Sequence, residues 1–209
     1  MYGGGVHQVG SGQVTDDSEM AWSLMLGILD SNPPRANNTQ LTPSNVSNII
    51  LNEDYLAFRY RDWYKSNPFD IGTTVRSSIS MLDSPMQDIE ESFNIVERET
   101  RAYDVKQTAK RINKLSRSNG GLMRIGPMAV WLAEHIKGRD DARYETFKTL
   151  IKADLELTHS DELSQQCCLL YSCAIAFLLN NPKLKDKGKK CFEECLRLST
   201  TPYCNYKTE

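Results

Sequence analysis

The sequence has 209 residues, of which 40% are hydrophobic and 25% are charged, and its formal net charge is −2 at pH 7. These values are typical of one soluble globular domain, and the absence of a basic field excludes nucleic acid and acidic membrane surfaces as expected partners. No apolar run approaches the roughly 18 residues of a membrane span. The glycine-rich residues 1–13 do not resemble a signal peptide, so we expect a flexible start and a cytoplasmic protein.

Helical periodicity dominates the chain, and no alternating pattern predicts a strand. The first predicted helix has Asp16 as its N-cap, Glu19 completing a capping box, and an end near Ser31. Residues 32–43 are predicted to form a loop, and Thr42-Pro43 at the end of this loop is predicted to start the second helix. The later helices are predicted at 44–65, 73–82, 102–115, 125–136, 142–157, 162–180 and 187–198. We therefore expect an all-α fold, with residues 1–209 forming a single compact multi-helix domain.

Thr15, Asp16 and Asp17 place a hydroxyl and two carboxylates together at the start of the first predicted helix. All three are hard oxygen donors of the kind that Mg²⁺ and Mn²⁺ prefer, and one carboxylate can bridge two such ions. The same residue types are also favoured as helix caps. Taken alone, the triplet is more often a cap than a metal site.

A basic stretch between residues 105 and 124 contains no acidic residue and ends in the turn Ser118-Asn119-Gly120-Gly121. A glycine-containing turn before a helix exposes backbone N–H groups that can hold phosphate oxygens, so a nucleotide diphosphate fits this arrangement. A solvated basic helix followed by a plain loop is the alternative, and it is the commoner outcome. The basic residues are Lys106, Lys110, Arg111, Lys114, Arg117 and Arg124.

His159 lies between two predicted helices, where Thr158 or Ser160 is a plausible cap, and it can either contact a ligand or pack locally. No Ser-His-Asp or Cys-His spacing supports nucleophilic catalysis. The three tryptophans lie within helical patterns and are expected in the core. Six cysteines lie in the last quarter of the chain, where buried thiols are a better interpretation than a zinc site at Cys191, Cys195 and Cys204.

Four segments, taken in order, resemble the ADP-ribosylglycohydrolase family, which includes the dinitrogenase reductase-activating glycohydrolases. The first and third are the most specific, because the family pattern has a TDD before a helix and an S-N-G-[AG]-x-M-R segment. The segments are GQVTDDSEMAWSLMLGIL (12–29), YRDWYKSNPFDIGTTV (60–75), SNGGLMRIGPMAV (118–130) and LTHSDELSQQCCLLYSCAIAFLL (157–179).

The resemblance implies an all-helical hydrolase that removes ADP-ribose from a modified protein side chain or a related ADP-ribosyl compound. By motif, Thr15, Asp16 and Asp17 match the N-terminal metal ligands, and Asp16 and Asp17 are the implied catalytic carboxylates. Ser118, Asn119, Gly120 and Gly121 match the loop that holds the ligand's phosphates and ribose, and His159 matches a histidine lining the same pocket. The family uses two Mg²⁺ or Mn²⁺ ions.

Two family motifs have no counterpart in this sequence: the early G-x-x-x-G-D helix, which carries a catalytic acid, and the late D-x-D-[ST] metal-binding motif. We therefore expect one ion or none here. Three interpretations remain: an enzyme whose missing segments come from elsewhere, for example a partner chain; a pseudoenzyme that binds ADP-ribose or a protein without hydrolysing it; and a helical interaction module. The partners implied by the first two are ADP-ribose or an ADP-ribosylated protein.

Overall fold

The computed structural model describes residues 4, 8–32, 50–83, 95–133 and 141–199. Within these residues every named element is helical, and the single β-type contact is an isolated bridge between Gly4 and Val9. The elements in chain order are α1 (Asp16–Ser31), α2 (Glu53–Lys65), α3 (Thr73–Ile79), η2 (Ser80–Asp83), α4 (Ile95–Ile112), α5 (Gly126–Ala133), α6 (Asp141–Leu155), α7 (Glu162–Asn180) and α8 (Lys187–Ser199). The prediction of an all-α fold is confirmed.

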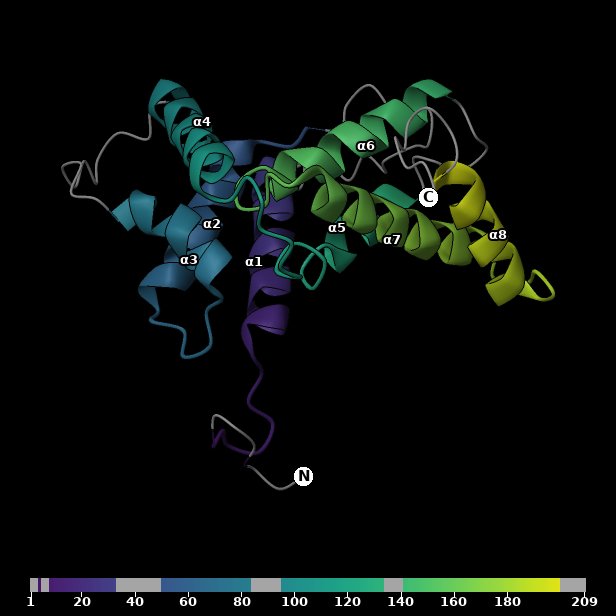
Figure 1. Ribbon diagram of the computed structural model, residues 1–209, viewed down its shortest axis with the longest axis horizontal. Helices are drawn as coiled ribbons and strands as arrows, with labels where there is room; N and C mark the ends of the chain where they lie inside the picture. The colour runs from purple at the N-terminus through teal and green to yellow at the C-terminus, as the bar shows by residue number, and fades with distance from the viewer. Residues whose placement is uncertain (1–3, 5–7, 33–49, 84–94, 134–140, 200–209) are drawn as a thin grey trace, which may run out of the picture.

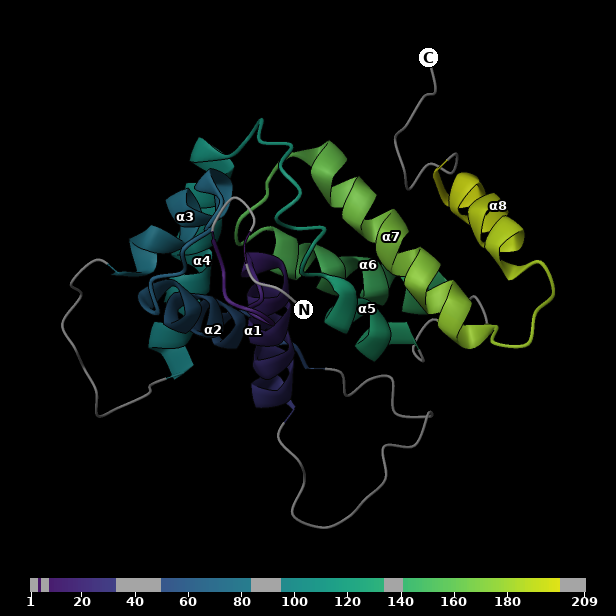
Figure 2. The ribbon, with the colours of Figure 1, turned by 90° about the horizontal axis from the view of Figure 1, so that it is seen from below.

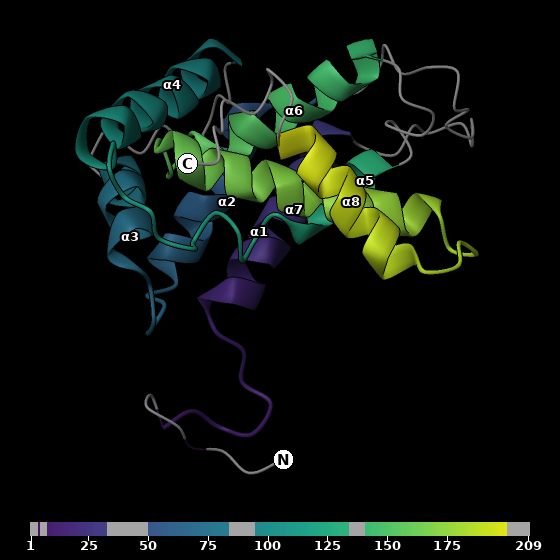
Figure 3. The same cartoon turned by 45° about the vertical axis from the view of Figure 1, so that its right-hand side comes forward.

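Helix α1 runs through the middle of the molecule, with α2, α3 and α4 on one side and α5, α6, α7 and α8 on the other (Figures 1 and 2). Residues 8–15, which precede α1, extend away from the helices (Figure 1). Helix α8 packs against α7 at the periphery (Figure 3). The N-terminal end of α1 and parts of the loops that precede α3 and α5 are exposed, whereas the loop that precedes α7 is largely buried.

The core begins where α1 packs against α2. Met20, Leu24 and Ile28 form the buried stripe of α1, which contacts Leu56 of α2. Gly27 makes this close approach feasible, because a Cβ atom built there would lie 2.5 Å from Leu56 Cδ2. The absence of a side chain at residue 27 therefore determines how closely the two helices pack.

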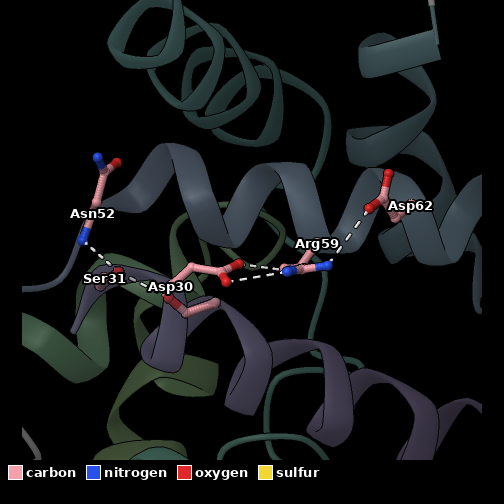
Figure 4. Close-up of polar contacts among 6 residues, drawn as sticks. Asp30, Ser31, Asn52, Arg59 and Asp62 are labelled. Carbon is pink, nitrogen blue, oxygen red and sulfur yellow. Dashed lines mark hydrogen bonds and ion pairs between the residues drawn. The ribbon is translucent and has the colours of Figure 1, made fainter. Parts of the chain in front are cut away.

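Polar contacts hold the far end of the same helix pair (Figure 4). Arg59 binds Asp30 with two hydrogen bonds, of 2.7 Å from Nε and 3.1 Å from Nη2. The Ser31 hydroxyl accepts a hydrogen bond from the backbone N–H of Asn52 at 3.0 Å. These contacts fix the C-terminal end of α1, and its N-terminal end lies at the candidate site.

Several helix boundaries differ from the predictions. The N-cap of α1 is Thr15 and not Asp16, and the predicted capping box does not form, since Glu19 instead accepts a 2.7 Å hydrogen bond from Trp63 Nε1. Helix α2 begins after Asn52, whose side chain caps the backbone N–H of Asp54, so the predicted continuous helix 44–65 is wrong at residues 50–52, and residues 44–49 lie outside the described residues. Most of the predicted loop 32–43, with Thr42-Pro43, lies outside the described residues.

Of the other local predictions, some are confirmed and others are wrong. The bounds of α7 match the prediction, although its N-cap is Asp161 and neither Thr158 nor Ser160. Trp63 and Trp131 pack in or against the core, whereas Trp22 is 60% exposed, so its predicted burial is wrong. Helix α7 is also long and apolar enough to cross a membrane, a test that the core helix of a soluble protein passes as well. It packs against α5, α6 and α8.

Candidate functional site

Three acidic residues, Asp16, Asp17 and Asp70, lie near the N-terminus of α1. Thr15, in an extended conformation, donates from its hydroxyl to Asp17 Oδ2 at 3.1 Å. The backbone N–H of Asp16 donates to Oδ2 of Asp70 at 3.0 Å. Asp70 lies in the loop between α2 and α3, 54 residues from Asp16 in the sequence. The Thr-Asp-Asp triplet therefore gains a third acidic residue from another part of the chain.

Asp70 is the site residue that the sequence analysis did not single out. It lies in the second family-like segment, in Asn67-Pro68-Phe69-Asp70. The signal that could have identified it is its position as an acidic residue between this turn and the next predicted helix. Its Oδ1 atom is buried and has no hydrogen-bond partner among the described residues. A buried carboxylate oxygen without a donor is costly. Asp70 Oδ1 is therefore an available ligand position.

The proximity of the three acids changes the ionisation of Asp16. Burial, followed by the negative charges of Asp70 and Asp17, raises the pKa of Asp16 from 3.8 to about 6. A cation bound among these oxygens would relieve that repulsion, and carboxylate and hydroxyl oxygens suit Mg²⁺ or Mn²⁺. Among the described residues, however, no group of three or more His, Cys, Asp or Glu side chains forms a metal-binding cluster. The oxygen donors present are therefore of the type that a hard divalent ion prefers, but they supply only part of a complete ligand set.

The second half of the candidate site is the turn before α5, which lies against His159. Ser118 Oγ lies 2.8 Å from His159 Nε2, and Thr158 Oγ1 lies 2.8 Å from Nδ1 of the same ring. Both imidazole nitrogens are thus engaged within the chain. The structure therefore brings together Ser118 and His159, which are 41 residues apart and were predicted to share a site.

Gly120 and Gly121 allow this close packing. A Cβ atom at Gly120 would lie 3.0 Å from Cε1 of His159, and one at Gly121 would lie 2.8 Å from Cδ2 of Leu155. Ser118 and Asn119 are exposed, whereas Gly120, Gly121 and His159 are buried. His159 therefore closes one side of the turn, and the other side is exposed at Ser118 and Asn119.

The buried imidazole of His159 is uncharged. Burial and the positive charge of Arg124 lower the pKa of His159 from 6.5 to about 3. At neutral pH the ring therefore has one N–H donor and one acceptor nitrogen. With its hydroxyl partners on either side, it acts as a rigid support for the turn.

Helix α3 links the carboxylates to the turn. It follows Asp70 by a few residues, its Thr74 Oγ1 lies 2.6 Å from Ser116 Oγ, and its Val75 side chain lies beside Gly120. Asn113 completes the link by donating from Nδ2 to the carbonyl oxygens of Thr74 at 2.8 Å and Thr158 at 2.9 Å. The two predicted halves of the site are thus connected through one short helix.

The basic stretch does not act as one surface. Lys106 binds Glu53 at 2.6 Å and Glu156 at 3.3 Å, and Arg124 is fully buried. Lys110, Arg111, Lys114 and Arg117 are exposed, and Arg117 lies 3.7 Å from Asp161. The cations available to a ligand therefore number fewer than the six in the sequence.

The comparisons with known proteins identify the family of the chain. The family model described as ADP-ribosylglycohydrolase matches residues 1–204. A protein of Acanthamoeba polyphaga mimivirus named "Putative ADP-ribosyl glycohydrolase L543" is 24% identical over 160 residues, a match that covers 77% of this chain and 37% of the viral protein. The chain thus corresponds to well under half of that relative's length. On the match along nearly its whole sequence, the chain belongs to the ADP-ribosylglycohydrolase family.

Proposed function

We propose that this chain hydrolyses the bond between ADP-ribose and a modified protein side chain, or a related ADP-ribosyl compound, with the help of Mg²⁺ or Mn²⁺. The observation that carries the proposal is the contact of the Asp70 carboxylate with the first turn of α1, near Asp16 and Asp17, with one buried Asp70 oxygen lacking a donor among the described residues. Family membership supports the reaction class.

Asp16, Asp17 and Asp70, with the Thr15 hydroxyl, are the groups that would hold the cation. When bound, such an ion orients ribose hydroxyls and lowers the pKa of the attacking water. The carboxylates also stabilise positive charge that develops on the sugar as the glycosidic bond breaks. The pKa of about 6 applies to Asp16 without a cation, and a bound divalent ion would lower it and hold the carboxylate ionised.

The turn before α5 supplies the second part of the proposed site. The exposed Ser118 and Asn119 would bind the ribose and the diphosphate, with backbone N–H groups of the turn contributing donors. His159 supports the turn from its buried side through the hydrogen bond with Ser118. Recognition of ADP-ribose would therefore depend on the turn, and bond cleavage on the acidic cluster.

The test is release of ADP-ribose from purified arginine-linked and serine-linked ADP-ribosylated proteins, with Mg²⁺, with Mn²⁺ and with a chelator. We expect release that requires the cation and that Asp16→Asn and Asp70→Asn abolish. Asp62→Asn is the matched control, because Asp62 is a half-exposed carboxylate on α2 (Figure 4). Release that is equal in all variants, or unaffected by the chelator, would contradict the proposal.

The second candidate function is ADP-ribose binding without hydrolysis. It is favoured by the lack of a complete metal-binding cluster among the described residues. Calorimetry distinguishes the two: binding of ADP-ribose together with no release from any substrate supports the binding protein. Release that appears only when a second chain is added supports an enzyme whose site is completed by a partner.

A further inference from the structure

A buried ion pair lies behind the turn that carries Ser118 to Gly121. Arg124 and Asp154 are both fully buried. Arg124 Nε donates to Asp154 Oδ2 at 3.1 Å, and Nη2 donates to the backbone carbonyl oxygen of Asp154 at 3.1 Å. One guanidinium group therefore binds both the side chain and the main chain of the same residue near the end of α6.

Tyr60 of α2 completes this cluster. Its hydroxyl donates to Asp154 Oδ1 at 2.5 Å, and its ring lies 4.7 Å from the guanidinium carbon of Arg124. Each carboxylate oxygen of Asp154 thus has a donor, and the cation rests on an aromatic face. The cluster joins α2, α6 and the segment before α5.

The cluster connects the same two segments that meet at the candidate ligand site. Arg124 follows Gly121 by three residues, and Asp154 precedes His159 by five. The segments are joined once by the contact between Ser118 and His159, and again by the contact between Arg124 and Asp154. Two separate attachment points restrict a turn far more than one does.

An apolar pair would fill this space at a lower desolvation cost, so stability alone is a poor reason for burying the two charges. What an ion pair adds is directional geometry, because a guanidinium group has fixed donor directions. The fixed directions here orient the backbone where the turn leads into α5.

We propose that Arg124, through its pair with Asp154, is a positioning residue that holds the Ser118–Gly121 turn against His159 in the geometry that receives ADP-ribose. The identity of the ligand rests on the proposed function, whereas the ordering of the turn does not. Arg124 itself lies behind the turn and acts through it.

The experiment combines hydrogen exchange of the backbone amides of residues 119–123 with calorimetric titration of ADP-ribose, using the full chain. Arg124→Met retains much of the side-chain length but removes the charge and both hydrogen bonds. We expect faster exchange in the turn and affinity weakened by at least about tenfold, because the binding groups lose their fixed placement. Arg124→Lys and Tyr60→Phe keep a cation beside Asp154, and we expect smaller changes in the same direction.

Two controls separate positioning from a general loss of stability. Arg59→Met breaks another two-bond Arg–Asp pair, at the far end of α1 from the candidate site (Figure 4). Leu56→Ala lowers stability by removing a buried side chain in the packing between α1 and α2. We expect both variants to keep the exchange rates of the turn and the ADP-ribose affinity of the wild type.

The proposal is overturned if Arg124→Met leaves the turn as protected as in the wild type, or if Leu56→Ala changes the turn equally at matched stability. If Arg124→Met does not fold, hydrogen exchange in Arg124→Lys and Tyr60→Phe tests the proposal instead. A turn as protected in both variants as in the wild type then overturns it. Wild-type protein that binds no ADP-ribose overturns the proposed function instead, and exchange alone then tests the positioning role.

Discussion

Asp70 accepts a hydrogen bond from the backbone N–H of Asp16 at 3.0 Å, across 54 residues of sequence. This contact attaches the loop before α3 to the first turn of α1. It occupies one carboxylate oxygen of Asp70 and leaves the other buried without a partner among the described residues. The relationship therefore makes Asp70 both a structural support for the Thr-Asp-Asp triplet and a candidate member of the same site.

Replacing Asp70 by alanine removes both roles at once. We expect Mg²⁺ or Mn²⁺ affinity, measured by calorimetry, to fall by about 10- to 100-fold, as is usual when a group that orients or completes a metal site is lost. Asp70→Asn retains an acceptor for the Asp16 N–H and therefore isolates the charge. Equal metal affinity in wild type and Asp70→Ala would exclude Asp70 from the site.

Removing the charge of Asp16 should stabilise the metal-free protein above pH 6. The pKa of Asp16 is raised to about 6, so the folded state holds its proton more tightly than the unfolded state does. The contribution of Asp16 to the stability of the wild type consequently falls as the pH rises from about 4 to 6 and then levels off. In Asp16→Asn this loss is absent.

The measurement is thermal unfolding of both proteins in chelator at pH 4 and at pH 7.5. We expect the melting temperature of Asp16→Asn to exceed that of the wild type by a few degrees at pH 7.5 only, since about 1 kcal/mol shifts it by about 2–4 °C in a chain of this size. ADP-ribose release should be lost in the same variant. A difference of the same size at pH 4 would contradict the ionisation argument.

His159 should make the protein sensitive to acid. Its pKa is lowered to about 3, so between pH 6.5 and 3 the unfolded state binds a proton that the folded state does not. Stability due to this residue is complete above pH 6.5 and is lost as the pH falls, by up to about 1.4 kcal/mol per pH unit.

Urea unfolding at pH 7, 5.5 and 4.5 checks this prediction. Replacement of His159 by glutamine should lower stability at pH 7, where the contacts with Ser118 and Thr158 are weakened, and should reduce the slope below pH 6.5. Carboxylates contribute equally to both proteins, so the difference in slope belongs to His159. Parallel curves would show that His159 is protonated in the folded protein at these pH values.

Adding one methyl group at Gly121 should displace the turn before α5. The new Cβ atom would lie 2.8 Å from Leu155 Cδ2 and 3.4 Å from Cys168 Sγ, so Gly121→Ala should cost about 1–3 kcal/mol of stability by overpacking. We also expect weaker ADP-ribose binding by calorimetry. Gly27→Ala is the control, because its Cβ atom would meet Leu56 in the core, where it should destabilise the fold but spare ADP-ribose affinity.

The sequence by itself determined the helical class and the position of most helices. Apolar spacing and flanking polar residues predicted α7 at its observed bounds, and α3 with η2 close to theirs, because the signals for a helix lie within the helix and its immediate neighbours. The family-like strings also identified Asp16, Asp17, Ser118 and His159 as site candidates, although their metal and substrate roles remain predictions.

Only the tertiary structure decided which groups meet. Glu19 was predicted to complete a capping box but binds Trp63, and Trp22 was predicted in the core but faces solvent. Asp70 joined the candidate site through a contact across 54 residues. A helical pattern specifies which residues share a face but not which partner that face or terminus will contact, because the partner is fixed by packing between distant segments.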